Sequence, residues 1–153
     1  SVLYYGGFVE GWAMYAELSS YDYAAGLAQD LHPKAADHYQ LCRLDRQIQL
    51  SLYALLDIFI HYDGATLENV YDILSSFGIA NTETMAAIYS YIAEEPCNYP
   101  KYYLGYLEIM ELKKQAAALW GENDSAFLYR FHCFLLENGP ADFGTLTKLL
   151  YTA

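Results

Sequence analysis

Residues 8–17 read FVEGWAMYAE, and this stretch decides the fold class. Its apolar side chains recur every three or four residues, as Phe8, Trp12 and Tyr15 show, which is the spacing of one face of an α-helix. Hardly any face of this helix is polar throughout, so we expect it to lie at the centre of the fold. Strict alternation of apolar and polar residues, the pattern of a β-strand, is scarce along the chain. The sequence therefore predicts an all-α protein.

Six further helices follow from the same spacing. Most predicted starts carry Asp, Asn, Thr or Pro and most predicted ends carry Gly, as helix termini prefer. The predicted helices cover residues 5–25, 33–62 (stopped at Gly64), 66–78, 82–95 (starting at Asn81 or Thr82), 100–121, 125–139 (capped by Asp124 or Ser125) and 142–150. The second is long for a globular protein, so we expect it either to span the domain or to kink. We expect an irregular bundle of about seven helices in one domain, residues 1–153.

Composition limits the classes of partner. The chain has 153 residues, of which 55% are hydrophobic and 18% charged, which suits one folded core and excludes intrinsic disorder. Eight Lys and Arg face nineteen Asp and Glu, for a net charge of −11. Nucleic acids and anionic membrane surfaces are disfavoured as partners because both bind basic side chains. No apolar run approaches the ~20 residues of a membrane-spanning helix, and no signal peptide is visible.

Three cysteines and seventeen tyrosines stand out in the composition. Cys42, Cys97 and Cys133 are odd in number and form no CxxC pair, so the sequence predicts small buried side chains and no disulfide framework. So many phenols indicate either polar-lined clefts or contact with another surface. The chain begins with Ser1 rather than Met, and we expect it to be a piece of a longer polypeptide.

Two carboxylates, Glu10 and Glu17, are seven residues apart and so share one face of the first helix. Because carboxylates on a largely apolar face need partners, this face indicates a bound cation, an arginine or a metal. The alternative is that the face reaches solvent or is neutralised by one of three arginines. Those arginines are Arg43, Arg46 and Arg130.

Asp57 and His61 form an i, i+4 pair near the end of the second helix. A carboxylate in this position can fix the tautomer of the imidazole, as in catalytic and metal-binding histidines. The alternative is a satisfied structural pair at the C-terminus of a helix, where a cationic His is also favoured. Leu50 and Ala54, which share the face of Asp57, are expected to turn inward.

Tyrosines crowd the start of the fifth helix, where Tyr102 shares a face with Gly105. A phenol beside a glycine that opens space could donate to a developing oxyanion. The alternative is an aromatic packing cluster. His132 lies on an apolar stripe of the sixth helix and is expected to be a hydrogen-bonded core residue. Metal-site, P-loop and nucleophile-elbow motifs are absent from the chain, HExxH among them.

Taken together, these stretches resemble the C-terminal part of the bacterial DUF885 family, which is grouped with zinc metallopeptidases of the thermolysin-like and oligopeptidase type. The resemblance covers about residues 8–150. Its motifs are Phe8-x-Glu10-Gly11-Trp12-Ala13-x-Tyr15-x-Glu17, Asp57-x-x-x-His61, Pro96 with Tyr102-x-x-Gly105 and Leu112-Lys113, and Phe131-His132-x-x-Leu135-Leu136-x-x-Gly139. After Pro96 the chain has Cys97-Asn98, where the family often has Gly-Gln.

The resemblance implies a role for each of five residues. Glu10 would be the third protein ligand of a zinc ion whose two histidine ligands come from an HExxH helix. Glu17 would not bind the zinc itself but would help to orient its ligands. Tyr102 and His61 would donate to the tetrahedral intermediate of peptide hydrolysis, and Asp57 would orient His61. In such sites zinc polarises the carbonyl and lowers the pKa of its water.

Because the chain lacks HExxH, the resemblance implies that the zinc histidines and the general base lie upstream of Ser1, in the same polypeptide. We therefore expect a C-terminal lobe of a zinc-dependent peptidase, which alone is inactive and binds no zinc tightly. The alternative is a non-catalytic helical domain that binds a peptide or protein. A third possibility is self-association through an exposed apolar face. The sequence identifies no substrate. It identifies no compartment either, because the export or lipid-anchoring signals of many relatives would lie upstream of Ser1.

Overall fold

The computed structural model describes residues 4–30, 32–121 and 125–152. Over these ranges the chain forms seven α-helices and no β-strand, which confirms the all-α class. The helices are α1 (Gly6–Gln29), α2 (Pro33–His61), α3 (Leu67–Ser76), α4 (Thr82–Glu94), α5 (Asn98–Trp120), α6 (Ser125–Asn138) and α7 (Phe143–Leu150). None of the described helices is long and apolar enough to cross a membrane.

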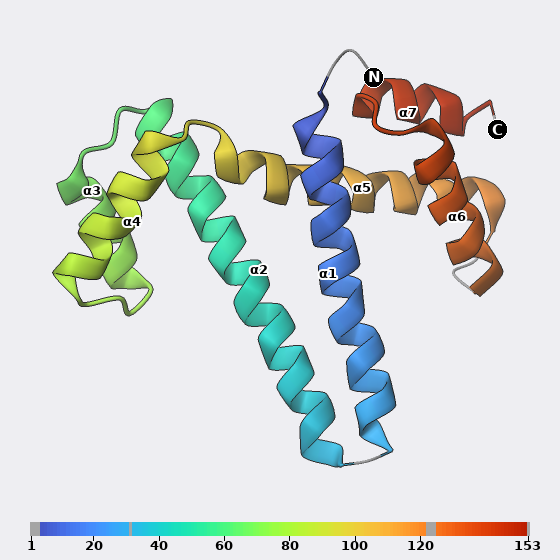
Figure 1. The fold of residues 1–153 in the computed structure, drawn as a ribbon, viewed down its shortest axis with the longest axis horizontal. Coiled ribbons are helices and arrows are strands. Elements are labelled where there is room, and N and C mark those ends of the chain that lie inside the picture. The colour runs from blue at the N-terminus through green and yellow to red at the C-terminus, as the bar shows by residue number, and fades with distance from the viewer. Residues whose placement is uncertain (1–3, 31, 122–124, 153) are drawn as a thin grey trace.

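Helix α1 is central, as expected, because it packs against both α2 and α5. Figure 1 shows α1 and α2 as a long antiparallel hairpin and α5 crossing its upper end. The α3–α4 pair lies beside the C-terminal end of α2, whereas α6 and α7 lie at the far end of α5. The lower half of the hairpin therefore projects away from the other helices.

Two glycines, Gly11 of α1 and Gly105 of α5, allow the two helices to cross in close contact. A Cβ atom on Gly105 would lie 2.0 Å from the carbonyl oxygen of Gly7, and one on Gly11 would lie 2.3 Å from the carbonyl carbon of Gly105. Real Cβ atoms do not approach backbone this closely, so only glycine fits at this crossing. The expectation that Gly105 opens space beside Tyr102 is wrong, because the backbone of α1 fills that space.

The apolar side chains form two core clusters. The larger one is built from α1, α5, α6 and α7 together with Leu50 of α2, and it includes Phe131 and Leu135, both fully buried. The smaller one joins the C-terminal half of α2 to α3 and α4 and includes Leu56 and Leu74. Tyr99, at the start of α5, packs against both clusters.

Helix starts lie where cap residues predicted them. Thr66 caps α3 and exchanges hydrogen bonds with Asn69 in a capping box, and the Asn81 side chain accepts from Thr84 N–H at α4. Asp142 accepts from Thr145 N–H at 2.9 Å and caps α7. Asp124, one of two predicted caps of α6, lies outside the described residues.

The two long helices differ in detail from the prediction. Helix α1 continues one turn beyond the predicted end at Ala25, because Gly26 keeps a helical conformation there. Helix α2 is one continuous helix of 29 residues, capped at its start by His32, whose Nδ1 accepts from Lys34 N–H at 3.2 Å. The prediction that all three cysteines are buried is wrong. Cys97 is exposed, Cys42 and Cys133 are half-buried, and all three are free thiols.

Candidate functional site

The crossing of α1 and α5 brings Glu10 beside Tyr102. Glu10 follows Gly7 by one turn, and Tyr102 precedes Gly105 by one turn, so both side chains emerge on one side of the contact. The Tyr102 hydroxyl donates a hydrogen bond to the half-buried Glu10 carboxylate. Burial raises the pKa of Tyr102, and the negative charge and hydrogen bond of Glu10 raise it further. The phenol is therefore a proton-bearing donor at neutral pH.

More tyrosines extend from this pair toward α2 and α4. The Tyr99 and Tyr53 rings meet edge to face with centroids 4.9 Å apart, and Tyr99 hydrogen-bonds the partly exposed Tyr91. Burial and these neighbouring phenols raise the pKa of Tyr99 to about 12. The aromatic cluster left open as an alternative for this region is therefore present, and it lies against the Glu10–Tyr102 pair.

Asp57 is 1% exposed and caps α5 from α2. One carboxylate oxygen accepts from Cys97 N–H at 2.9 Å and the other accepts from Tyr99 N–H at 3.1 Å. These N–H groups belong to the first turn of α5, where no side chain of the helix's own N-cap residue serves. Cys97 has φ 63°, a left-handed conformation that suits the glycine often found there in the resembling family. The structure thus gives Asp57 a role that sequence reasoning missed.

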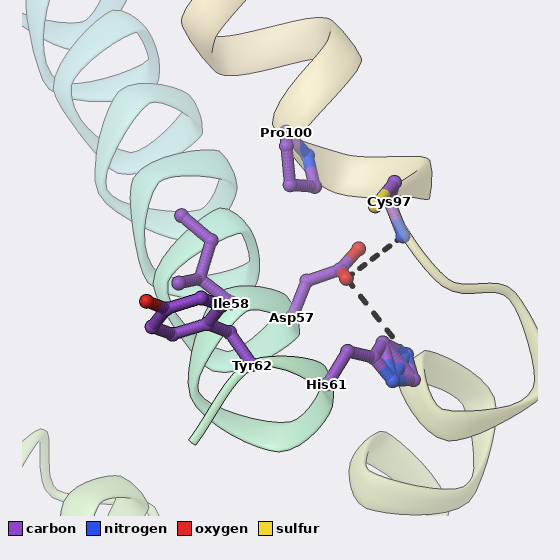
Figure 2. Close-up of a pocket in the computed structure, with 6 residues that line it drawn as sticks. All are labelled: Asp57, Ile58, His61, Tyr62, Cys97 and Pro100. Carbon is purple, nitrogen blue, oxygen red and sulfur yellow. Dashed lines mark hydrogen bonds and ion pairs between the residues drawn. The ribbon is translucent and has the colours of Figure 1, made fainter. Parts of the chain in front are cut away.

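His61 lies next to Asp57 but hydrogen-bonds elsewhere. Its Nε2 donates to the Ile92 carbonyl of α4 at 3.2 Å, whereas its distance to Asp57 Oδ1 is 3.8 Å. The backbone N–H groups, not the imidazole, are therefore the hydrogen-bond partners of Asp57. Figure 2 shows the Asp57 carboxylate between the turn at Cys97 and the His61 imidazole. The role of Asp57 in orienting His61 stays a prediction.

A pocket of about 340 Å³ opens beside this pair. It is lined by Asp57, Ile58, His61, Tyr62, Cys97 and Pro100. Glu10 and Tyr102 are not among these residues, although Tyr102 follows Pro100 closely in α5. The structure thus shows two separate pairs near the start of α5, Glu10 with Tyr102 and Asp57 with His61. That Glu10, Tyr102 and His61 open onto one groove stays a prediction.

Glu17 has an arginine partner. Arg46 of α2 contacts it through two nitrogens, with Nε 2.9 Å from Oε1 and Nη2 3.4 Å from Oε2. The neighbouring Asp22 on α1 pairs with Arg43 Nε at 3.2 Å. For Glu17 the structure realises the alternative of neutralisation by arginine, and both pairs join α1 to α2.

His132 is hydrogen-bonded, as predicted, but it is half-buried and not part of the core. Its Nε2 lies 3.0 Å from the Tyr15 hydroxyl, which joins α6 to α1. Burial lowers the pKa of His132, and the positive charge of Lys113 lowers it further. Lys113 also lies over the Tyr15 ring, 5.2 Å from its centroid. The sequence carried no signal for this Tyr15–His132 pair, because 117 positions separate the two residues.

Across residues 4–30, 32–121 and 125–152 no three His, Cys, Asp or Glu side chains gather where they could hold a metal ion. A catalytic zinc needs three protein ligands. The described residues alone therefore do not fit a zinc ion, and Glu10 stands as a single candidate ligand.

Over the described residues, fold and site define an all-α protein in which a carboxylate–phenol pair lies at a close helix crossing. The chain matches the DUF885 family, described as bacterial proteins of unknown function, over residues 1–150. It therefore belongs to that family. Neither the curated proteins nor the solved structures gave a match.

Proposed function

We propose that this chain is the helical part of a zinc-dependent peptidase, in which Glu10 is the third protein ligand. The two histidine ligands and the general base would come from an HExxH helix in a segment of the same polypeptide that precedes Ser1. Tyr102 and His61 would contact the substrate, a peptide, and Glu17 would support α1 through its arginine partner. The family resemblance suggests these roles, and the positions of the side chains in this chain support them.

The observation that carries the proposal is the difference between the two carboxylates of α1. Glu17 is neutralised by Arg46, whereas among the described residues Glu10 has no ion pair and only the neutral Tyr102 hydroxyl beside it. A half-buried carboxylate without a cation is costly, because a phenol compensates only part of the lost hydration. A cation supplied by another segment would remove that cost.

The side chains of this chain suit the remaining tasks. Tyr102 keeps its proton at neutral pH, so it can donate to a negative oxygen that develops within its reach. His61 is held in orientation by the Ile92 carbonyl. Asp57 holds the first turn of α5, which directly precedes Tyr102, at a fixed position relative to α2.

The test joins this chain to the coding sequence that precedes Ser1 and measures zinc per polypeptide and peptide hydrolysis. We expect an HExxH motif there and one zinc per chain. Glu10→Gln should lose most of the zinc, whereas Glu17→Gln on the same helix should retain it. Tyr102→Phe should keep the zinc and lower kcat by about 10²–10³-fold, as for the loss of one oxyanion donor.

The 153-residue chain alone should bind zinc weakly and hydrolyse no peptide. Absence of HExxH upstream, or full zinc content in the Glu10→Gln protein, would exclude the proposal. The second candidate, a non-catalytic domain that binds a peptide or protein, would then be favoured. The largely apolar pocket beside His61 supports that candidate, since Ile58 and Pro100 could contact an apolar side chain.

A further inference from the structure

Helix α2 carries an apolar stripe that no described part of the chain covers. Its six large members keep 40–86% of their surface exposed. They are Leu41, Leu44, Ile48, Leu55, Ile58 and Tyr62. We name these six residues, together with Ser51, the α2 stripe. Single exposed apolar residues are ordinary, but a continuous line along one helix marks an interaction surface.

The spacing of the α2 stripe is that of a helix–helix seam. Successive members are three and four residues apart in strict alternation, with Ser51 at the middle position. This heptad spacing keeps the members within about 100° of the helix circumference and allows a partner helix to pack over about 30 Å. The other faces of α2 are already used, because Leu50 and Ala54 are buried on one side and Leu52 and Leu56 on another. The α2 stripe therefore fits a helix from outside the described residues.

The stripe is complementary to itself. Rotation about a two-fold axis at Ser51 places Ile48 opposite Leu55 of the partner subunit and Leu44 opposite Ile58 of the partner subunit. Leu41 then faces Tyr62 of the partner subunit, and the two small Ser51 side chains meet where the helices come closest. Such an isologous contact forms a closed dimer.

Charge and shape favour the antiparallel arrangement of two copies. Helix α2 carries three basic and three acidic side chains, so the whole net charge of −11 resides in the rest of the chain. Antiparallel pairing keeps the two acidic bodies at opposite ends, whereas parallel pairing would place both at one end. The bulk of the molecule adjoins the upper end of α2, and the lower half of the hairpin is free to receive the other body (Figure 1).

We propose that two copies of this chain associate through the α2 stripe as an antiparallel dimer. Ile58 and Tyr62 belong both to the stripe and to the lining of the pocket beside His61. The partner subunit's Leu41 and Leu44 therefore form an additional wall of that pocket. The inference does not depend on a zinc site.

The first test measures mass in solution by sedimentation and light scattering over a range of protein concentrations. The unaltered chain should be a dimer at tens of micromolar. Ile48→Glu and Leu55→Glu together place acids opposite acids and should raise the dimer Kd at least 100-fold while helical content stays unchanged. Leu136→Glu is the matched control, because Leu136 is 63% exposed on α6, and it should leave the dimer intact.

The second test determines orientation by disulfide formation in a chain whose three natural cysteines are replaced by serine. Leu44→Cys mixed with Ile58→Cys should give a mixed disulfide dimer in high yield, and each alone should give little. A monomer at 200 micromolar, a dimer that survives Ile48→Glu with Leu55→Glu, or cross-linking of Leu44→Cys to itself would overturn the proposal. So would a preceding segment that covers the stripe and leaves the longer polypeptide monomeric.

Discussion

Asp57 shows how one buried carboxylate can hold two helices together. A buried carboxylate is stable only when hydrogen bonds replace its lost hydration. Asp57 obtains two such bonds from the first turn of α5 and so joins two helices that are 40 residues apart in sequence. His61, one helical turn after Asp57, therefore lies beside the turn of α5 that Asp57 stabilises.

His132 should make folding stability depend on pH. Its pKa in the folded chain lies below the ordinary 6.5, since burial and Lys113 disfavour the imidazolium. The unfolded chain therefore binds more protons as pH falls through 6.5, so the free energy of unfolding decreases there and levels off below the folded-state pKa. We expect the urea midpoint to fall between pH 7.5 and pH 5.5, and His132→Gln to reduce that slope.

Tyr15→Phe is the matched control for His132. It removes the hydroxyl partner of the imidazole but leaves the burial and the lysine charge, which cause the pKa shift. The control should lower stability at every pH and keep the slope. A slope unchanged by His132→Gln would show that other groups govern this pH range.

At the scale of the element, the glycine contact between α1 and α5 holds Glu10 against Tyr102. Gly105→Ala would place a methyl group against the Gly7 backbone, and because backbone cannot move aside cheaply we expect a loss of about 3 kcal/mol or more in unfolding free energy. Gly26→Ala, in α1 with no atom within 4 Å of its new Cβ, should stabilise by about 0.5–1 kcal/mol. Urea unfolding followed by circular dichroism checks both.

The contrast between the two variants is the decisive comparison. Equal effects would mean that helix propensity alone sets the cost and that the crossing is loosely packed. The Tyr102 phenol offers a second readout, since separation of α1 from α5 would remove its hydrogen bond to Glu10 and shift its ultraviolet titration to lower pH.

Helix existence and limits were predictable because their signals are local. Thr66, Asn81 and Asp142 cap their own helices, and each signal lies within a few residues of its effect. The pairing of elements was less predictable. Only the folded chain shows that Gly11 of α1 packs against Gly105 of α5.

The same limit applied to the candidate site. Face sharing on one helix correctly placed Leu50, Ala54 and Asp57 inward, because helix periodicity determines it. Helix periodicity did not predict which residues of different helices contact each other. Local spacing gives no signal that Arg46 pairs with Glu17 or that Asp57 caps α5. The prediction that Cys97 is buried was wrong because Cys97 lies in the turn that Asp57 caps.

At the scale of the whole molecule, we expect the two core clusters to divide the chain into regions of different stability. Helices α3 and α4 pack chiefly on each other and on the end of α2, whereas α1, α5, α6 and α7 share the larger cluster. The clusters meet at Tyr99 and along α2. Proteins open in cooperative units of this kind, and the unit with fewer contacts opens at lower free energy.

Leu74→Ala and Leu135→Ala test this division, because both leucines are 0% exposed and each belongs to a different cluster. Each truncation should cost its own cluster about 2–5 kcal/mol. By hydrogen exchange, Leu74→Ala should lower amide protection in α3 and α4 and leave α6 and α7 protected. Leu135→Ala should lower protection in both regions, since α3 and α4 depend on an α2 that α1 and α5 hold in place. Equal loss of protection everywhere in the Leu74→Ala protein would instead mean that the chain opens as one cooperative unit.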